Sequence, residues 1–249
     1  MTRLRYLGLG SVARFVLLRN CGLLVLALLA FAALAAQARA DERQREFVPE
    51  LNAYANLSDR TRLFLLGDVT RNTTAGATEG ELGAHLDVTF KPILRPELHA
   101  ADWERNRYLW TRVGYVQLST PDKRSSGPTE RRGILELTGR IPMPQDVWLV
   151  QRGRVDLRDI DGEFSQRYRY RLGIEREFSV SGVVMVPYAQ AEIYYDTRYD
   201  SWNRRLYQLG AEIELSKHWR IEPYLARQND SRSSSGNVDR VGFVLKYYH

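Results

Sequence analysis

The stretch that most constrains the fold is residues 167–175, where side chains of two kinds alternate without interruption. One parity is aromatic or aliphatic and comprises Tyr168, Tyr170, Leu172 and Ile174. The other parity is charged and comprises Arg167, Arg169, Arg171 and Glu175. A β-strand sends successive side chains to opposite faces, so this stretch predicts a strand with one apolar and one cationic face.

Segments of about ten alternating residues recur along the chain, and this length favours a membrane β-barrel. We count eleven of them, near residues 48–57, 62–71, 81–90, 109–115, 135–141, 147–157, 167–175, 189–196, 207–214, 219–228 and 240–247. Strands of soluble proteins have about five or six residues, whereas a tilted strand that crosses a bilayer needs about ten. The apolar faces would meet lipid and the charged faces would line the lumen. The expected fold is all-β, a transmembrane antiparallel β-barrel formed by residues 41–249.

The number of strands is expected to be even, as in most bacterial barrels. We therefore expect about 12 strands, with 10 as the fallback. A twelfth strand would come from part of residues 41–50 or part of residues 91–101. The connections alternate between short turns, expected on the periplasmic side, and longer external loops. These loops are expected at residues 72–80, 120–132, 158–166, 198–204 and 229–239.

Residues 1–40 have the features of a cleavable secretory signal peptide that forms a helix. A basic stretch and an apolar run precede Ala38-Arg39-Ala40, so cleavage is expected after Ala40. An uncleaved anchor is the alternative, for which the apolar run is short. This segment holds five arginines and no acidic residue, which leaves 31 basic and 30 acidic side chains, a net charge of +1. The mature chain therefore gives no reason to expect nucleic acid as a partner, and it contains no cysteine.

The last segment, residues 240–247, resembles the C-terminal β-signal that the outer-membrane assembly machinery reads. Its marks are Gly242, Leu245 and Tyr247, although Tyr248 and His249 follow, so the final residue is not the usual aromatic. Together with the export signal, this pattern predicts a protein of the bacterial outer membrane. The expected partners are outer-membrane lipid and the assembly machinery.

Several phrases of the sequence resemble a family of uncharacterised proteobacterial outer-membrane proteins, known only as a domain of unknown function, DUF2490. They are residues 102–107, 112–115, 167–171 and 221–224, together with the closing segment. The resemblance extends over most of the mature chain. It implies the location and the fold, and it implies no activity and no site residues.

The candidate site is the charged interior of the barrel. The predicted cationic wall comprises Arg152, Arg154, Arg167, Arg169 and Arg171, and the predicted acidic wall comprises Glu192, Asp196, Glu212, Glu214 and Glu222. Charges that line a pore select ions by sign. The leading hypothesis is a narrow channel or solute-binding barrel that favours small anionic solutes, acidic sugars among them. The alternative is a plugged barrel, in which these charges pair across the lumen and the external loops serve a structural or surface-interaction role.

A lipid-modifying enzyme of the outer membrane is the third hypothesis. A catalytic triad needs an oriented base beside its nucleophile. His85 is expected to point inward beside Asp87, but the sequence places no serine for it to activate. The other histidines, His99, His218 and His249, lie in an irregular segment, in a turn and at the C-terminus. No metal-spaced cluster or phosphate-binding loop is evident, so we expect no metal and no other cofactor.

Overall fold

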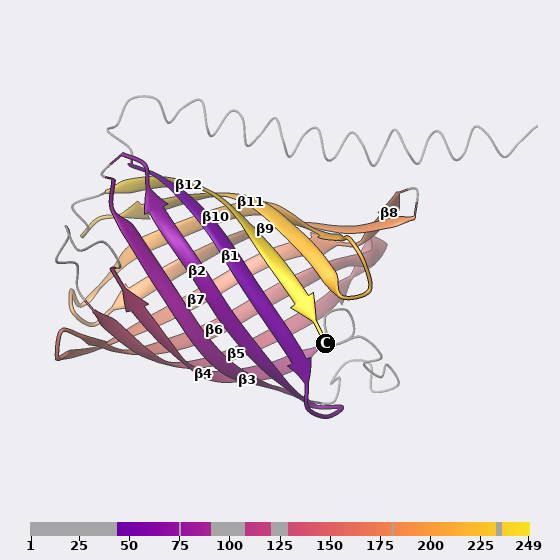
Figure 1. Ribbon diagram of the computed structural model, residues 1–249, viewed down its shortest axis with the longest axis horizontal. Helices are drawn as coiled ribbons and strands as arrows, with labels where there is room; N and C mark the ends of the chain where they lie inside the picture. Colours follow the sequence, from indigo (N-terminus) through magenta and orange to yellow (C-terminus); the bar gives the residue numbers. More distant parts are fainter. Residues whose placement is uncertain (1–43, 75, 91–107, 121–128, 181, 233–235) are drawn as a thin grey trace, which may run out of the picture. The chain divides into compact units, whose positions relative to one another are not determined.

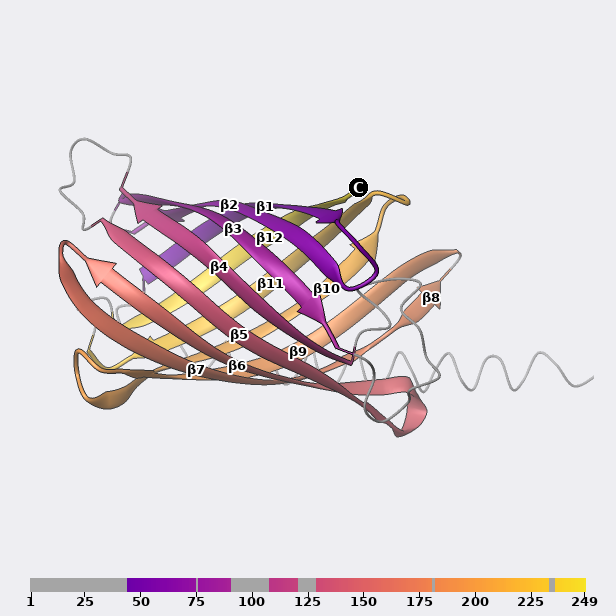
Figure 2. The same ribbon diagram turned by 90° about the horizontal axis from the view of Figure 1, so that it is seen from below.

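The computed structural model describes residues 44–74, 76–90, 108–120, 129–180, 182–232 and 236–249, and these residues form a β-barrel (Figures 1 and 2). Among them, eleven long strands close into a ring in the order β1-β2-β3-β4-β5-β6-β7-β9-β10-β11-β12, and β12 pairs with β1. A short strand, β8, extends the sheet beside β9 at one end of the barrel. The predicted all-β barrel is confirmed.

The ring strands have 11–14 residues each, the length expected for segments that cross a bilayer. The first six are β1 (Gln44–Asn56), β2 (Thr61–Asn72), β3 (Thr78–Thr89), β4 (Leu109–Ser119), β5 (Glu130–Met143) and β6 (Val147–Ile160). The others are β7 (Glu163–Arg176), β9 (Val183–Asp196), β10 (Ser201–Glu214), β11 (Trp219–Asp230) and β12 (Asn237–Tyr248). A 3-10 turn (Pro144–Asp146) joins β5 to β6, and β8 is Phe178–Val180.

The ring has an odd number of strands, which differs from the even number expected. The sheet contains twelve strands among the described residues, but only eleven span the barrel, one for each alternating segment of the sequence. In an odd ring the first and last strands run in the same direction. Accordingly, β1 and β12 pair in parallel from Gln44–Val238 to Tyr54–Tyr248. The parallel pairing of β1 with β12 therefore closes the barrel with eleven strands, and no twelfth spanning strand is needed.

The side chains alternate between the two surfaces of the barrel as predicted. Tyr170, Leu172 and Ile174 are 44%, 45% and 53% exposed on the outer surface. Their neighbours Arg167, Arg169 and Arg171 are inside, where each forms ion pairs with interior acids. The same division holds around the ring, so apolar side chains cover the outer surface and charged ones fill the interior.

Strands β6 and β7 run further into the expected external loop than the sequence pattern indicated. A loop was expected at residues 158–166, but only Asp161 and Gly162 lie between the two strands. Both residues have positive φ angles, 52° and 91°. An Asp-Gly pair in this conformation makes a tight hairpin turn whose twist matches that of its strands. The longer β6 brings Arg158 into the charged interior, where it shares Asp196 with Arg167.

Two of the sequence predictions lie outside the described residues. They are the signal peptide with its cleavage site after Ala40, and the contribution of residues 91–101, which include His99. Within the described residues, no helix has the length and apolar character needed to cross a bilayer.

Candidate functional site

Four arginines from two neighbouring strands form the centre of the charged interior, and we call them the arginine square. In the pairing of β6 with β7, Arg152 lies directly opposite Arg171, and Arg154 lies directly opposite Arg169. Like charges in directly opposed positions of a sheet destabilise it unless other groups compensate them. The arginine square therefore needs anionic partners, and the residues around it supply them.

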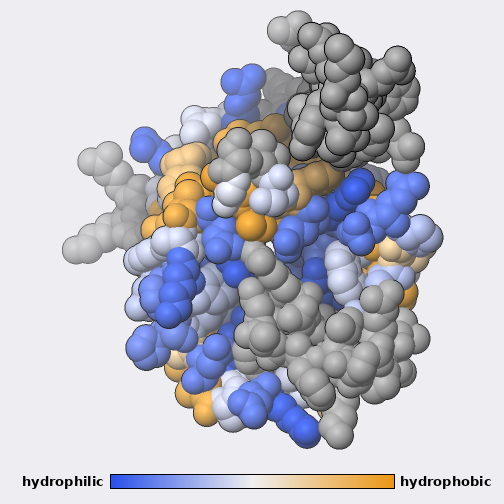
Figure 3. Space-filling model, turned by 90° about the vertical axis from the view of Figure 1, so that its right-hand side faces the viewer, coloured by the Kyte–Doolittle hydropathy of each residue, from blue (hydrophilic) through white to orange (hydrophobic). Residues whose placement is uncertain are grey.

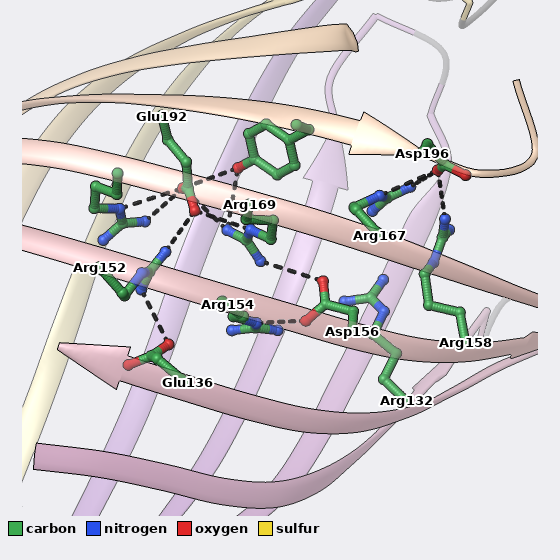
Figure 4. A network of polar contacts seen from close by, with 12 residues as sticks. Arg132, Glu136, Arg152, Arg154, Asp156, Arg158, Arg167, Arg169, Glu192 and Asp196 are labelled. Carbon is green, nitrogen blue, oxygen red and sulfur yellow. Dashed lines mark hydrogen bonds and ion pairs between the residues drawn. The ribbon is translucent and has the colours of Figure 1, made fainter. Parts of the chain in front are cut away.

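Glu192, on the adjacent strand β9, is the main partner of the arginine square (Figure 4). Its carboxylate accepts from Arg152 at 2.7 Å, from Arg169 at 2.9 Å and from Arg171 at 2.9 Å. The Tyr194 hydroxyl donates to it at 3.0 Å. The Glu192 side chain is only 1% exposed, so three guanidinium groups converge on one fully buried carboxylate.

Two further acids complete the compensation of the arginine square. Asp156 pairs with Arg154 at 2.5 Å and with Arg169 at 3.7 Å. Glu136 lies 3.6 Å from Arg152. Four positive charges thus face three negative ones, which leaves a surplus of one positive charge.

Arg167 belongs to a second network, nearer the hairpin end of β6 and β7. It donates to Asp196 at 2.9 Å, and Asp196 also accepts from Arg158 at 2.7 Å. Arg158 in turn pairs with Glu130. All four side chains are buried, so this network lies within the packed interior of the barrel.

A cavity of about 630 Å³ lies in the lumen, and every member of the arginine square lines it. The acids beneath the square are buried: Asp156 and Glu192 are each 1% exposed at the side chain and do not line the cavity. The part of the cavity wall that the arginine square forms is therefore cationic, although Glu136 on β5 and Glu175 on β7 also line the cavity. Figure 3 views the end of the barrel where β8 lies. Hydrophilic residues lie around its centre and along parts of its margin, and hydrophobic ones lie mainly toward the outside of the barrel.

The predicted acidic wall is divided between two places. Glu192 and Asp196 lie beside the arginines on the neighbouring strand and pair with them directly, so they do not form a facing wall. Glu212 and Glu222 line the cavity further round the ring, and both pair with Lys246, at 2.5 Å and 2.7 Å. Glu214 lines the same cavity.

A row of acids that the sequence pattern did not reveal lies across the lumen from the arginine square. Glu50 on β1 is directly opposite Asp68 on β2, which is directly opposite Glu81 on β3. All three line the cavity. In the ring of eleven strands, β1 is five strands from β6 in one direction and five from β7 in the other. The segments that carry Glu50 and Asp68, near residues 48–57 and 62–71, alternate less cleanly than the others, so these two acids were not recognised in the sequence.

His85 does not form the catalytic pair with Asp87 that the sequence suggested. The Asp87 carboxylate is held by Arg62 at 2.6 Å and by Arg112 at 2.6 Å. Neither ring nitrogen of His85 has a hydrogen-bond partner among the described residues. The ring instead stacks on Phe64, with the centroids 4.9 Å apart.

His85 ends a ladder of stacked rings across four neighbouring strands. Tyr54 stacks on Tyr248 and on Phe64, with 4.8 Å between the centroids in both contacts. Both faces of the Tyr54 ring are thus covered by other rings. The Tyr54–Tyr248 contact joins β1 to β12 and reinforces the parallel closure of the ring.

The three residues of the β-signal lie on β12. Gly242 faces inward against Tyr224, where a Cβ atom would lie 2.3 Å from the ring, so a larger residue there would require Tyr224 to move. The Tyr247 ring is on the outer surface 4.9 Å from that of Trp219, and Leu245 has the same parity as Tyr247.

No model of a protein family matches the chain, and no curated protein matches it. Among solved structures, the chain is similar to the β domain of the Bordetella autotransporter BrkA. The TM-score is 0.44 and the identity 13%, over 76% of this chain and 81% of that chain.

Proposed function

We propose that the protein is an outer-membrane barrel whose lumen binds or conducts small anionic solutes. Two features support the location. Many large apolar side chains are exposed on the outer surface, and the ring has no unpaired edge along its spanning strands. Backbone polar groups in lipid must be satisfied internally, which a closed barrel achieves. The predicted β-signal and signal peptide agree with this location, and the resemblance to DUF2490 remains a prediction.

The observation that carries the functional proposal is the unequal exposure of the interior charges. The arginine square lines the cavity, whereas Asp156 and Glu192 are buried beneath it. A solute in the cavity therefore meets guanidinium groups before it meets Asp156 or Glu192. Glu136, the third counter-charge, lines the cavity 3.6 Å from Arg152. Guanidinium groups bind carboxylate and phosphate well because their planar fork of donors matches two acceptor oxygens.

The charge preference can be tested by recording currents across a planar lipid bilayer under a potassium chloride gradient. We expect a reversal potential that indicates preference for chloride. The double variant R152Q/R171Q should shift this potential toward zero, because it removes one directly opposed pair of cations. The matched control is R205Q, since Arg205 is exposed on the outer surface of β10. An unselective current, or a selectivity that R152Q/R171Q leaves unchanged, would contradict the proposal.

The second candidate, a plugged structural barrel, is favoured by the ion pairs themselves. Each member of the arginine square is already held by at least one acid, and such pairs keep a polar interior satisfied without any solute. This candidate predicts no measurable conductance from correctly folded protein. It also predicts that R152Q/R171Q changes stability alone.

A further inference from the structure

The acid row across the lumen lacks the compensation that the arginine square has. Glu50, Asp68 and Glu81 lie in directly opposed positions on three adjacent strands. Glu81 pairs with Arg132 at 3.0 Å. Neither Glu50 nor Asp68 has an ion pair with any residue in the described part of the chain, although each lies directly opposite another acid. Like charges in this arrangement are stabilised when a cation lies beside them.

The nearby basic side chains are occupied elsewhere. Lys246 lies opposite Asn52 in the β1–β12 pairing, but its ammonium group is held by Glu212 and Glu222. Arg240 is held by Glu46 at 2.6 Å. Because Lys246 and Arg240 pair with other acids, the carboxylates of Glu50 and Asp68 are available to bind a solute.

Asn52 supplies an independent sign of a missing partner at this place. Its side chain is 5% exposed, lines the cavity and donates from Nδ2 to Glu50 at 2.7 Å. Its Oδ1 atom is buried and has no hydrogen-bond partner among the described residues. A buried acceptor without a donor costs about 1–3 kcal/mol, so such atoms normally meet a partner. The Asn52 oxygen and two ionised carboxylates only accept hydrogen bonds, so a cation that only donates would satisfy all three. An ammonium ion is such a group, and its three donors match three acceptors.

We propose that Glu50, Asp68 and Asn52 form an ammonium-binding subsite, and that the solute of this lumen is zwitterionic. Its anionic end would contact the arginine square, so the inference rests on the proposed function. Its ammonium end would lie across the lumen on β1 and β2. The position of β1 opposite the β6–β7 pair places the two subsites on facing walls of one cavity. A solute that bears both charges satisfies both walls, whereas a simple anion satisfies one.

The test compares matched probes by titration calorimetry on the full-length protein in detergent. The probes are 4-aminobutyrate and 6-aminohexanoate, the carboxylates butyrate and hexanoate, and the amines butylammonium and hexylammonium. We expect one of the two amino acids to bind about tenfold more tightly than the carboxylate of the same length, the increment of a charge-assisted hydrogen bond. The variant E50Q/D68N should abolish this advantage and leave carboxylate binding unchanged. It should also fold, because it removes opposed like charges.

The possible outcomes separate the two proposals. If carboxylates bind better than amines but neither amino acid exceeds its parent carboxylate, the ammonium subsite is refuted and the anion site stands. The ammonium subsite is also refuted if the amino-acid advantage survives in E50Q/D68N. If carboxylates bind no better than amines, both proposals fail. The control variant is E163Q, since Glu163 is exposed at the hairpin end of β7.

Discussion

Replacing Glu192 with glutamine should destabilise the barrel more than any exposed change of the same kind. The substitution keeps the shape of the side chain and removes its charge. The carboxylate is 1% exposed and pairs with Arg152, Arg169 and Arg171 at 2.7, 2.9 and 2.9 Å. Removing one partner of a buried ion pair costs about 3–5 kcal/mol. The three arginines are 14–19% exposed, so water solvates them in part, and we expect a loss of about 3 kcal/mol.

The measurement is urea-induced unfolding of the barrel in lipid vesicles, followed by tryptophan fluorescence and by mobility on gels. The unfolding midpoint of E192Q should fall while the dependence on urea stays unchanged, which marks a loss of stability without a change in the surface exposed. The control E163Q should stay within about 0.5 kcal/mol of the wild type. The double variant E192Q/R171Q should recover part of the loss, because one uncompensated cation is removed. If E192Q also stays within about 0.5 kcal/mol of the wild type, the arginine square does not depend on Glu192.

Two further predictions concern the ring ladder, and both are measured by the same unfolding experiment. Phe64→Ala should cost about 3–5 kcal/mol, because Phe64 is 4% exposed, whereas Phe164→Ala should cost far less, because Phe164 is 68% exposed. Equal losses would contradict a buried ladder. Gly114→Ala should cost about 1–3 kcal/mol, because its Cβ would lie 2.0 Å from the His85 ring, whereas Gly153→Ala meets no atom within 4 Å. Similar stability of the two alanine variants would show that His85 moves freely.

The sequence was sufficient to predict the surface on which each side chain lies. The two-residue period of residues 167–175 placed the arginines inside and the tyrosines outside, as observed. The face on which a side chain lies depends only on strand geometry, so it can be predicted without knowing how many strands the ring has. All ten residues of the predicted walls have the inward parity.

The partners of these residues could not be predicted from parity, because pairing depends on strand order and register. Glu192 lies one strand from Arg171 and directly opposite it, so the two form a local pair. Glu50 and Asp68, which face the arginine square across the lumen, lie on β1 and β2, far in the sequence from β6 and β7. The eleven alternating segments correspond to the eleven ring strands, whereas the rule that barrels have an even number of strands led us to expect about 12. The Asp161-Gly162 pair is typical of a two-residue hairpin turn, but the charged residues on both sides of it led us to expect a longer loop.

The most direct test asks which face of β7 touches lipid. Single cysteines at positions 167–172, in a chain with Cys21 replaced by serine, can carry a fluorescent label in vesicles that contain brominated lipid. We expect strong quenching by the lipid at positions 168, 170 and 172, and weak quenching at 167, 169 and 171. A membrane-impermeant thiol reagent should react in the opposite pattern. Lipid quenching at 169 and 171, or quenching without alternation, would contradict an arginine-lined lumen enclosed by an apolar outer surface.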